Sequence, residues 1–206
     1  MSAGDEMSTT LPESDAKEFS TVEDVLALLD MVRAAGAKTW LHGGWAFEAI
    51  TGISRPHHDI DLLSLEEYRP ILRDVFRELI GRETSHKLEF SFRGSKVDFV
   101  FAEPWTRGRF VSWSPRLIVP WPGNLISHDR RAKLGGREVP VICPEALFIE
   151  IANDVGRVKH KMRDKAQRDL ALYGDLLVAP ENQAAMRKMY PLENTRWNRL
   201  RVKLGL

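Results

Sequence analysis

Apolar residues recur at three- and four-residue spacing between residues 21 and 35, which is the period of an amphipathic helix. The stripe comprises Val22, Val25, Leu26, Leu28, Leu29 and Val32. Thr21 is placed to cap the first turn, with Asp24 three residues later as the second half of a capping-box-like start. Gly36 suits the end of a helix. The pattern therefore predicts that the ordered part of the chain begins with a helix.

Short apolar segments separated by glycine follow this helix. Residues 38–42 predict a strand that enters the pair Gly43-Gly44, and residues 45–50 predict a helix that Gly52 ends. The sequence thus predicts a strand and a helix joined directly through two glycines.

A second strand and a longer helix are predicted after a polar connection at residues 54–58. Residues 59–63 are mostly aliphatic and predict the strand. Ser64 is placed to cap a helix over residues 65–80, with Gly81 closing it. The predicted buried side of this helix is Leu65, Tyr68, Ile71, Leu72, Val75, Phe76 and Leu79.

Strict alternation of apolar and polar residues predicts two further strands, over residues 87–92 and 96–102, joined by a turn at residues 93–95. One face of the later strand carries Val97, Phe99 and Phe101. Asp98 lies on the opposite face, in the middle of a very apolar strand. A charged residue in that position requires an explanation.

The remaining sequence predicts a loop, a hairpin and helices. Residues 103–122 are rich in Trp, Pro and Arg and predict a long functional loop with short strands. Residues 132–142 predict a hairpin that turns at Gly135-Gly136. Helices are predicted over residues 145–151, 156–173 and 181–190, followed by a basic segment at residues 196–203.

The order of these elements predicts an α+β (or α/β) fold, in which a mixed sheet is flanked by helices and the C-terminal part is mainly helical. Residues 1–20 are polar and acidic, and we expect a disordered leader there. We expect a catalytic domain at residues 21–142 and a helical region at residues 143–206.

Composition is ordinary for a soluble globular protein, with 206 residues of which 43% are hydrophobic and 29% charged. The formal net charge of +1 gives no indication of a nucleic-acid or membrane partner. Cys143 is the single cysteine, so an intramolecular disulfide is excluded. Neither a signal peptide nor a bilayer-spanning apolar run is present, and we expect a cytoplasmic protein.

Three aspartates form the strongest candidate for chemistry. Asp59 and Asp61 share one face of their strand because side chains alternate along it, and Asp98 lies on a strand that can pair beside it. Converging carboxylates suit a hard cation and predict a site for two Mg²⁺ ions. The alternatives are solvated carboxylates at a strand edge and, for Asp98, a buried aspartate paired with arginine or with backbone N–H groups.

The glycine pair is the second candidate. Gly43 and Gly44 open a predicted helix, where exposed backbone N–H groups can bind a phosphate. Gly-Gly is also common in turns, so the pair alone is a weak signal.

The combination of these motifs resembles the nucleotidyltransferases of the DNA polymerase β type. Gly43-Gly44-Trp45-Ala46 followed by Ser54-Arg55-Pro56-His57-His58-Asp59-Ile60-Asp61 is similar to the aminoglycoside 2''-adenylyltransferases and the small lincosamide nucleotidyltransferases. Their motif is Gly-Gly-Trp and then Thr-Arg-x-His-x-Asp-Ile/Leu-Asp, so Ser54 replaces a threonine here. A helical Lys-x-x-x-Asp-Leu also matches, at Lys165, Asp169 and Leu170.

The resemblance implies a role for each matching position. Asp59 and Asp61 would hold the metal ions, and Asp98 would complete the metal's ligands and help deprotonate the acceptor hydroxyl. The residues implied to bind the nucleotide, ATP or another NTP, are Gly43, Gly44, Arg55, His57 and Lys165. The implied reaction is in-line attack of a hydroxyl on the α-phosphate, with pyrophosphate leaving.

Several of these residues also have structural interpretations. His57 and His58 could be solvated or satisfied locally, and His42 could simply close a strand. Arg55 could be the partner of one of the aspartates. Lys165 lies in a basic run, and such runs are usually solvated faces.

Acceptor-binding residues are less well defined by the sequence. Glu89, Glu103 and Glu145 are candidates for holding a cationic acceptor, and Trp105 is a candidate for stacking on a sugar. Trp105 could equally be a packing residue.

The resulting hypothesis is a Mg²⁺-dependent nucleotidyltransferase that moves a nucleoside monophosphate, AMP in the first instance, to a hydroxyl of an aminoglycoside or lincosamide. It would act as a monomer or homodimer. The near-neutral charge favours the lincosamide or an unknown acceptor over a polycation. One alternative is a toxin–antitoxin-type enzyme that modifies a protein or RNA, and another is a non-catalytic nucleotide-binding module.

Overall fold

The computed structural model describes residues 18–105, 108–113, 117–121, 130–157, 160–187, 192–193 and 195–204. Its helices are α1 (Val22–Ala34), α2 (Gly43–Thr51), α3 (Arg69–Val75), α4 (Pro144–Arg157), α5 (His160–Leu177), α6 (Pro180–Met186) and α7 (Arg196–Leu204), and a 3-10 helix η2 (Glu66–Tyr68) precedes α3. Its strands are β1 (Thr39–Leu41), β2 (Asp59–Leu65), β3 (Ile80–Glu83), β4 (Lys87–Phe92), β5 (Ser95–Pro104), β6 (Phe110–Trp113), β7 (Leu117–Trp121), β8 (Arg131–Leu134), β9 (Arg137–Pro140) and β10 (Leu192–Glu193).

A mixed sheet organises the molecule, in the order β1-β2-β5-β6-β7-β10, with β4 pairing β5 and β3 pairing β4. The pairing of β2 with β5 is parallel, and every other strand pairing in this sheet is antiparallel. β8 and β9 form a separate hairpin. The mixed α+β architecture predicted from the sequence is therefore confirmed.

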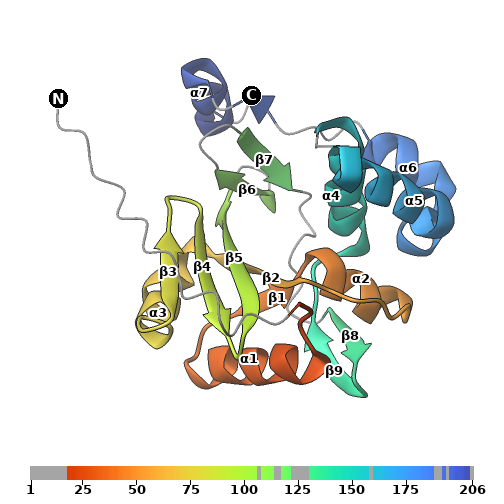
Figure 1. Cartoon of the computed structure of the whole chain (residues 1–206). Helices are drawn as coiled ribbons and strands as arrows, with labels where there is room; N and C mark the ends of the chain where they lie inside the picture. Colours follow the sequence, from red (N-terminus) through yellow and green to blue (C-terminus); the bar gives the residue numbers. More distant parts are fainter. Residues whose placement is uncertain are drawn as a thin grey trace.

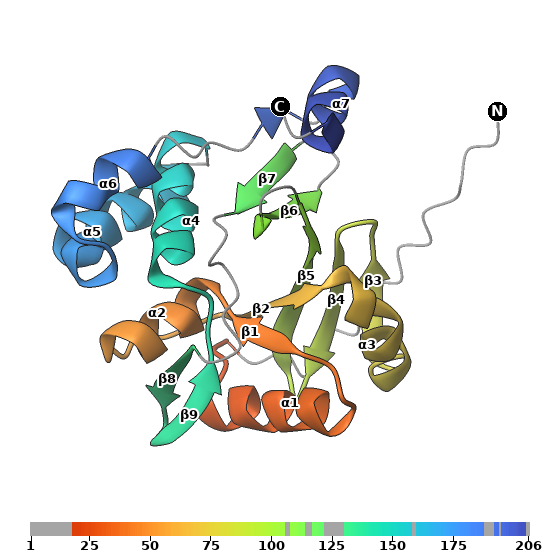
Figure 2. The same cartoon turned by 180° about the vertical axis from the view of Figure 1, so that it is seen from behind.

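The helices lie on different sides of this sheet. Figure 1 shows α1 below the lower ends of the central strands, while α4, α5 and α6 gather on one side of the molecule. The view from behind shows α7 beside β6 and β7 (Figure 2). No helix in the described part of the chain is long and apolar enough to cross a bilayer.

One part of the core lies on the apolar face of β4 and β5. Val97, Phe99 and Phe101 are buried, as the alternation predicted. Phe90 stacks on Phe99 and on Phe76 at centroid distances of 5.9 and 4.7 Å. Burying these rings turns Asp98 to the opposite face of the sheet.

The helix predicted over residues 65–80 is present but shorter, as η2 and α3 over residues 66–75. Ser64 belongs to β2, where its backbone pairs with Thr39 and Phe101, and its hydroxyl donates to the Lys38 carbonyl. Strand pairing on both sides thus overrides the capping signal. The helical part is limited to η2 and α3, and the chain then enters β3.

The structure also contains elements that the sequence did not predict, namely β3, β10 and the helix α7, and other differences concern element ends. α2 begins at Gly43 rather than at residue 45, and β5 continues to Pro104. Residues 1–17 of the expected leader lie outside the described residues. Ser20, which was expected to belong to that leader, is buried and forms an isolated bridge with His57.

Candidate active site

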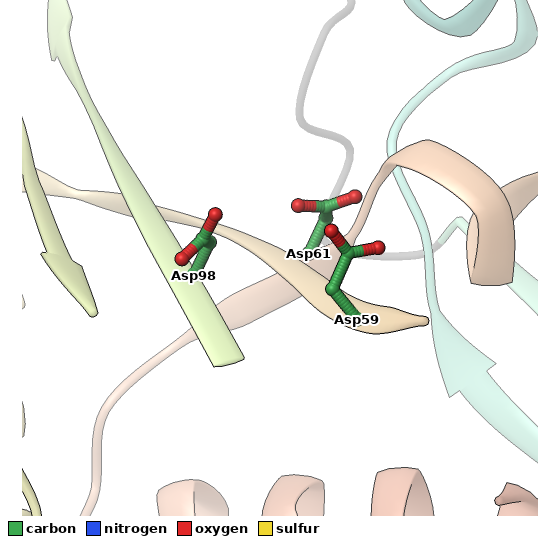
Figure 3. Close-up of side chains that lie close together, drawn as sticks. All are labelled: Asp59, Asp61 and Asp98. Carbon is green, nitrogen blue, oxygen red and sulfur yellow. The ribbon is translucent and has the colours of Figure 1, made fainter. Parts of the chain in front are cut away.

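Asp59, Asp61 and Asp98 meet on one face of two neighbouring strands. The parallel register of β2 and β5 places Asp61 directly opposite Asp98. One carboxylate oxygen from each residue lies within 4.8 Å of the others. Figure 3 shows the three carboxylates projecting from the same side of β2 and β5. The convergence predicted from the alternation pattern is present.

These carboxylates fit a divalent cation. Burial raises the pKa of Asp61 to about 7, with Asp59, Glu150 and Asp98 adding to this effect and His42 opposing it. The Oδ1 atom of Asp98 is buried and makes no hydrogen bond among the described residues. A set of three oxygen donors with mutual repulsion and one unsatisfied oxygen is suited to Mg²⁺.

The glycine pair packs directly against this site. Gly43 has φ +61°, and a Cβ atom there would lie 2.3 Å from Oδ2 of Asp61. A Cβ atom at Gly44 would lie 2.4 Å from Nδ1 of His57. Both positions therefore require glycine because the side chains of Asp61 and His57 approach the backbone, a reason that the sequence alone did not reveal.

His42 and Glu150 form a pair that the sequence analysis missed. Nδ1 of His42 lies 3.0 Å from Oε1 of Glu150, and the Gly43 N–H donates to Oε2 of the same carboxylate. Burial opposes the charged imidazole, but Glu150 outweighs this and raises the pKa of His42 to about 9. Residues three and four positions apart lie on one face of a helix. Ala146 and Leu147 are buried at these distances before Glu150, so the helical spacing was the signal that Glu150 faces inward.

Arg55 has a structural partner, but it is not one of the three aspartates in the site. Its guanidinium donates to Asp169 on α5 at 2.7 Å and lies over the Phe47 ring at 4.5 Å. The two separated parts of the sequence motif, one around Arg55 and one around Asp169, thus meet in space. Lys165, one turn before Asp169, has an exposed side chain, and its nucleotide contact stays a prediction.

His57 is held inside the fold. Its Nε2 lies 2.9 Å from Oε2 of Glu48, and its ring packs on Trp45 at 4.2 Å between centroids. Burial, above all, lowers the pKa of His57, although Glu48 opposes this. The local partner considered for His57 is present, and a nucleotide contact stays a prediction.

The acceptor candidates lie at two separate places. Glu89 on β4 is the register partner of Asp98, so it lies beside the carboxylate cluster. Glu103 is exposed near the end of β5. Trp105 donates its Nε1–H to the Val202 carbonyl and packs with the small apolar cluster beneath α7, which agrees with a packing role.

The model of the aminoglycoside-2''-adenylyltransferase family matches residues 24–172, which include the carboxylate cluster, the glycine pair and Asp169. The chain belongs to this family. It is therefore a nucleotidyltransferase, and the family resemblance expected from the sequence is confirmed. A comparison with curated protein sequences gives no match.

Solved structures share the fold of this family member. The solution structure of the antibiotic-resistance factor ANT(2'')-Ia is 20% identical with a TM-score of 0.61, covering 87% of this chain and 94% of that one. The crystal structure of ANT(2'')-Ia with adenylyl-2''-tobramycin is 20% identical with a TM-score of 0.61, covering 81% and 96%. Lincomycin-bound lincosamide adenylyltransferase LnuA is 16% identical with a TM-score of 0.59, covering 75% and 98%.

Proposed function

We propose that this nucleotidyltransferase moves AMP from MgATP to a hydroxyl of a small antibiotic, with an aminoglycoside as the first candidate and a lincosamide as the second. The observation that carries this proposal is the in-register cluster of Asp59, Asp61 and Asp98 in a member of the aminoglycoside-2''-adenylyltransferase family. The names of the similar structures, one with adenylyl-2''-tobramycin and one with lincomycin, support both acceptor classes.

The three carboxylates share the metal ions in this reaction, and one of them has a second task. Asp59 and Asp61 hold the metal ions, and Asp98 is both a ligand and the acceptor of the hydroxyl proton. Two Mg²⁺ ions, when bound, offset the triphosphate charge and stabilise the attacking and leaving oxygens. The unsatisfied Oδ1 of Asp98 gives this residue an oxygen that is available for such a contact.

The nucleotide lies over the start of α2 in this proposal. The N-terminus of α2 presents backbone N–H groups and a positive dipole to the triphosphate. Gly44 contributes a backbone N–H at this helix start, and the exposed ammonium group of Lys165 offsets the phosphate charge. Holding the two substrates in line supplies much of the rate enhancement.

Pyrophosphate release tests the proposal. The full chain is assayed with MgATP and MgGTP against a panel of aminoglycosides and lincosamides, beside the Asp61→Asn and Asp98→Asn variants. Asp30→Asn is the matched control, because Asp30 is an exposed carboxylate on α1 that pairs with Arg33 and Arg137. We expect release with at least one antibiotic, lost in the two site variants and kept in the control. Undiminished pyrophosphate release in Asp61→Asn would contradict the assignment of Asp61 as a metal ligand. The absence of release with every antibiotic of the panel would contradict an antibiotic as the acceptor.

A further inference from the structure

Cations are interleaved with the carboxylates on the polar face of β2, β5 and β4. Residues in register lie on the same face of a sheet. Asp59 is opposite Lys96 and Asp61 is opposite Asp98, while Asp98 is also opposite Glu89. The carboxylate cluster therefore carries a lysine at the position next to Asp59.

Lys96 contacts the cluster directly. Its Nζ donates to Oδ2 of Asp98 at 3.0 Å, and Lys87 approaches the same oxygen at 3.6 Å. The other oxygen of Asp98, Oδ1, is the buried atom without a hydrogen bond among the described residues. One oxygen of this carboxylate thus already has a cationic partner.

The two lysines differ in how firmly they are held. Lys87 is 23% exposed and is fixed by its ion pair with Glu89. Lys96 is 55% exposed, and Asp98 is its only ion-pair partner among the described residues. A long, half-exposed side chain with one carboxylate contact can swing into solvent at little cost.

We propose that Lys96 is a tethered cation that competes with a divalent metal ion for Asp98 and so limits the affinity of the site for the free ion. This inference rests on the metal site of the proposed function. The ammonium group relieves repulsion among the three carboxylates, and a doubly charged ion bound to the carboxylate of Asp98 repels it. The metal ion then binds best together with the triphosphate, whose charge adds to that of the carboxylates.

If Lys96 were merely structural, its removal would change the metal affinity in the opposite direction. A residue that only orients a metal-binding carboxylate supports metal binding, and its loss weakens metal affinity about 10- to 100-fold. A competing cation has the reverse effect, because its removal leaves a more negative site. The direction of the change in affinity therefore separates the two roles.

The test is direct titration of the full chain with Mn²⁺ in the absence of nucleotide, followed by electron paramagnetic resonance of the free ion. We expect Lys96→Met to bind Mn²⁺ about tenfold more tightly than the wild type, given the screening at a half-exposed site. Lys96→Arg keeps the charge and should stay near the wild-type affinity. Lys133→Met is the matched control, since Lys133 is exposed on the separate β8–β9 hairpin.

Affinity that is unchanged or weaker in Lys96→Met overturns the inference, as does the absence of Mn²⁺ binding. Asp61→Asn separates this failure from failure of the proposed function. If Asp61→Asn loses Mn²⁺ while Lys96→Met matches the wild type, the metal site stands and the role of Lys96 falls. If Asp61→Asn binds as the wild type does, the metal site itself is wrong. Thermal unfolding checks that each variant is folded.

Discussion

His42 and Glu150 are 108 positions apart in the sequence, yet Nδ1 of the imidazole lies 3.0 Å from the Glu150 carboxylate. This contact joins the loop between β1 and α2 to α4. Because Glu150 also accepts the Gly43 N–H, the pair fixes the helical C-terminal region against the start of α2.

Stability should depend on pH through this pair. The pKa of His42 is raised from 6.5 to about 9, since the opposing effect of burial is outweighed by Glu150. Its contribution to the free energy of unfolding is therefore complete below pH 6.5 and is lost as the pH rises through about 9. Between pH 6.5 and about 9, we expect the free energy of unfolding to fall by about 2 kcal/mol more in the wild type than in Glu150→Gln. Urea unfolding at a series of pH values measures this difference. Parallel pH profiles for the two proteins would contradict the assignment.

Asp61→Asn should stabilise the fold while it removes the proposed metal ligand. The pKa of Asp61 is raised from 3.8 to about 7, chiefly by burial. The folded protein thus holds this proton more tightly than the unfolded chain, and the associated stability is lost as the pH rises through about 7. At pH near 8 and without divalent ions, we expect the free energy of unfolding of Asp61→Asn to exceed that of the wild type by about 1 kcal/mol. Added Mg²⁺ should then raise the melting temperature of the wild type more than that of the variant.

Gly43→Ala and Gly52→Ala separate backbone strain from damage to the site. Gly43, the first residue of α2, and Gly52, its C-cap, both have positive φ. A Cβ at Gly52 meets no atom within 4 Å, whereas one at Gly43 meets Asp61. Each variant should lose about 1 kcal/mol of unfolding free energy. Only Gly43→Ala should also lose about 100-fold in turnover, because Asp61 is displaced. Equal turnover in the two variants would show that Asp61 tolerates the extra methyl group.

Arg55 is expected to act first as a structural residue. Its side chain and that of Asp169 are 22% and 11% exposed, so removing one partner leaves a largely buried charge. We expect Arg55→Met to cost about 3 kcal/mol, and a double-mutant cycle with Asp169→Leu to recover part of it. A phosphate contact would appear separately, as a higher KM for ATP in Arg55→Met than in Asp169→Leu.

The sequence predicted those features that depend on local pattern. Alternation in residues 96–102 placed Asp98 on the polar face, and the turn at Gly135-Gly136 predicted the β8–β9 hairpin, which the structure confirms. The helix over residues 65–80 is shorter than predicted because Ser64 and Ile80 pair with other strands at its two ends, which is a tertiary effect. His42–Glu150 and Arg55–Asp169 could not be predicted, since nothing local fixes which distant charges meet.

The parallel pairing of β2 and β5 has a consequence for how this family can change. The register of the two strands sets Asp61 opposite Asp98, and the buried apolar residues of both strands, such as Leu62 and Phe99, hold that register. A shift of one residue would turn the side chains of one strand to the other face and separate the two carboxylates, so the buried residues of β2 and β5 are constrained by the carboxylate cluster. Exposed residues outside these two strands carry no such constraint and can vary without moving the carboxylates.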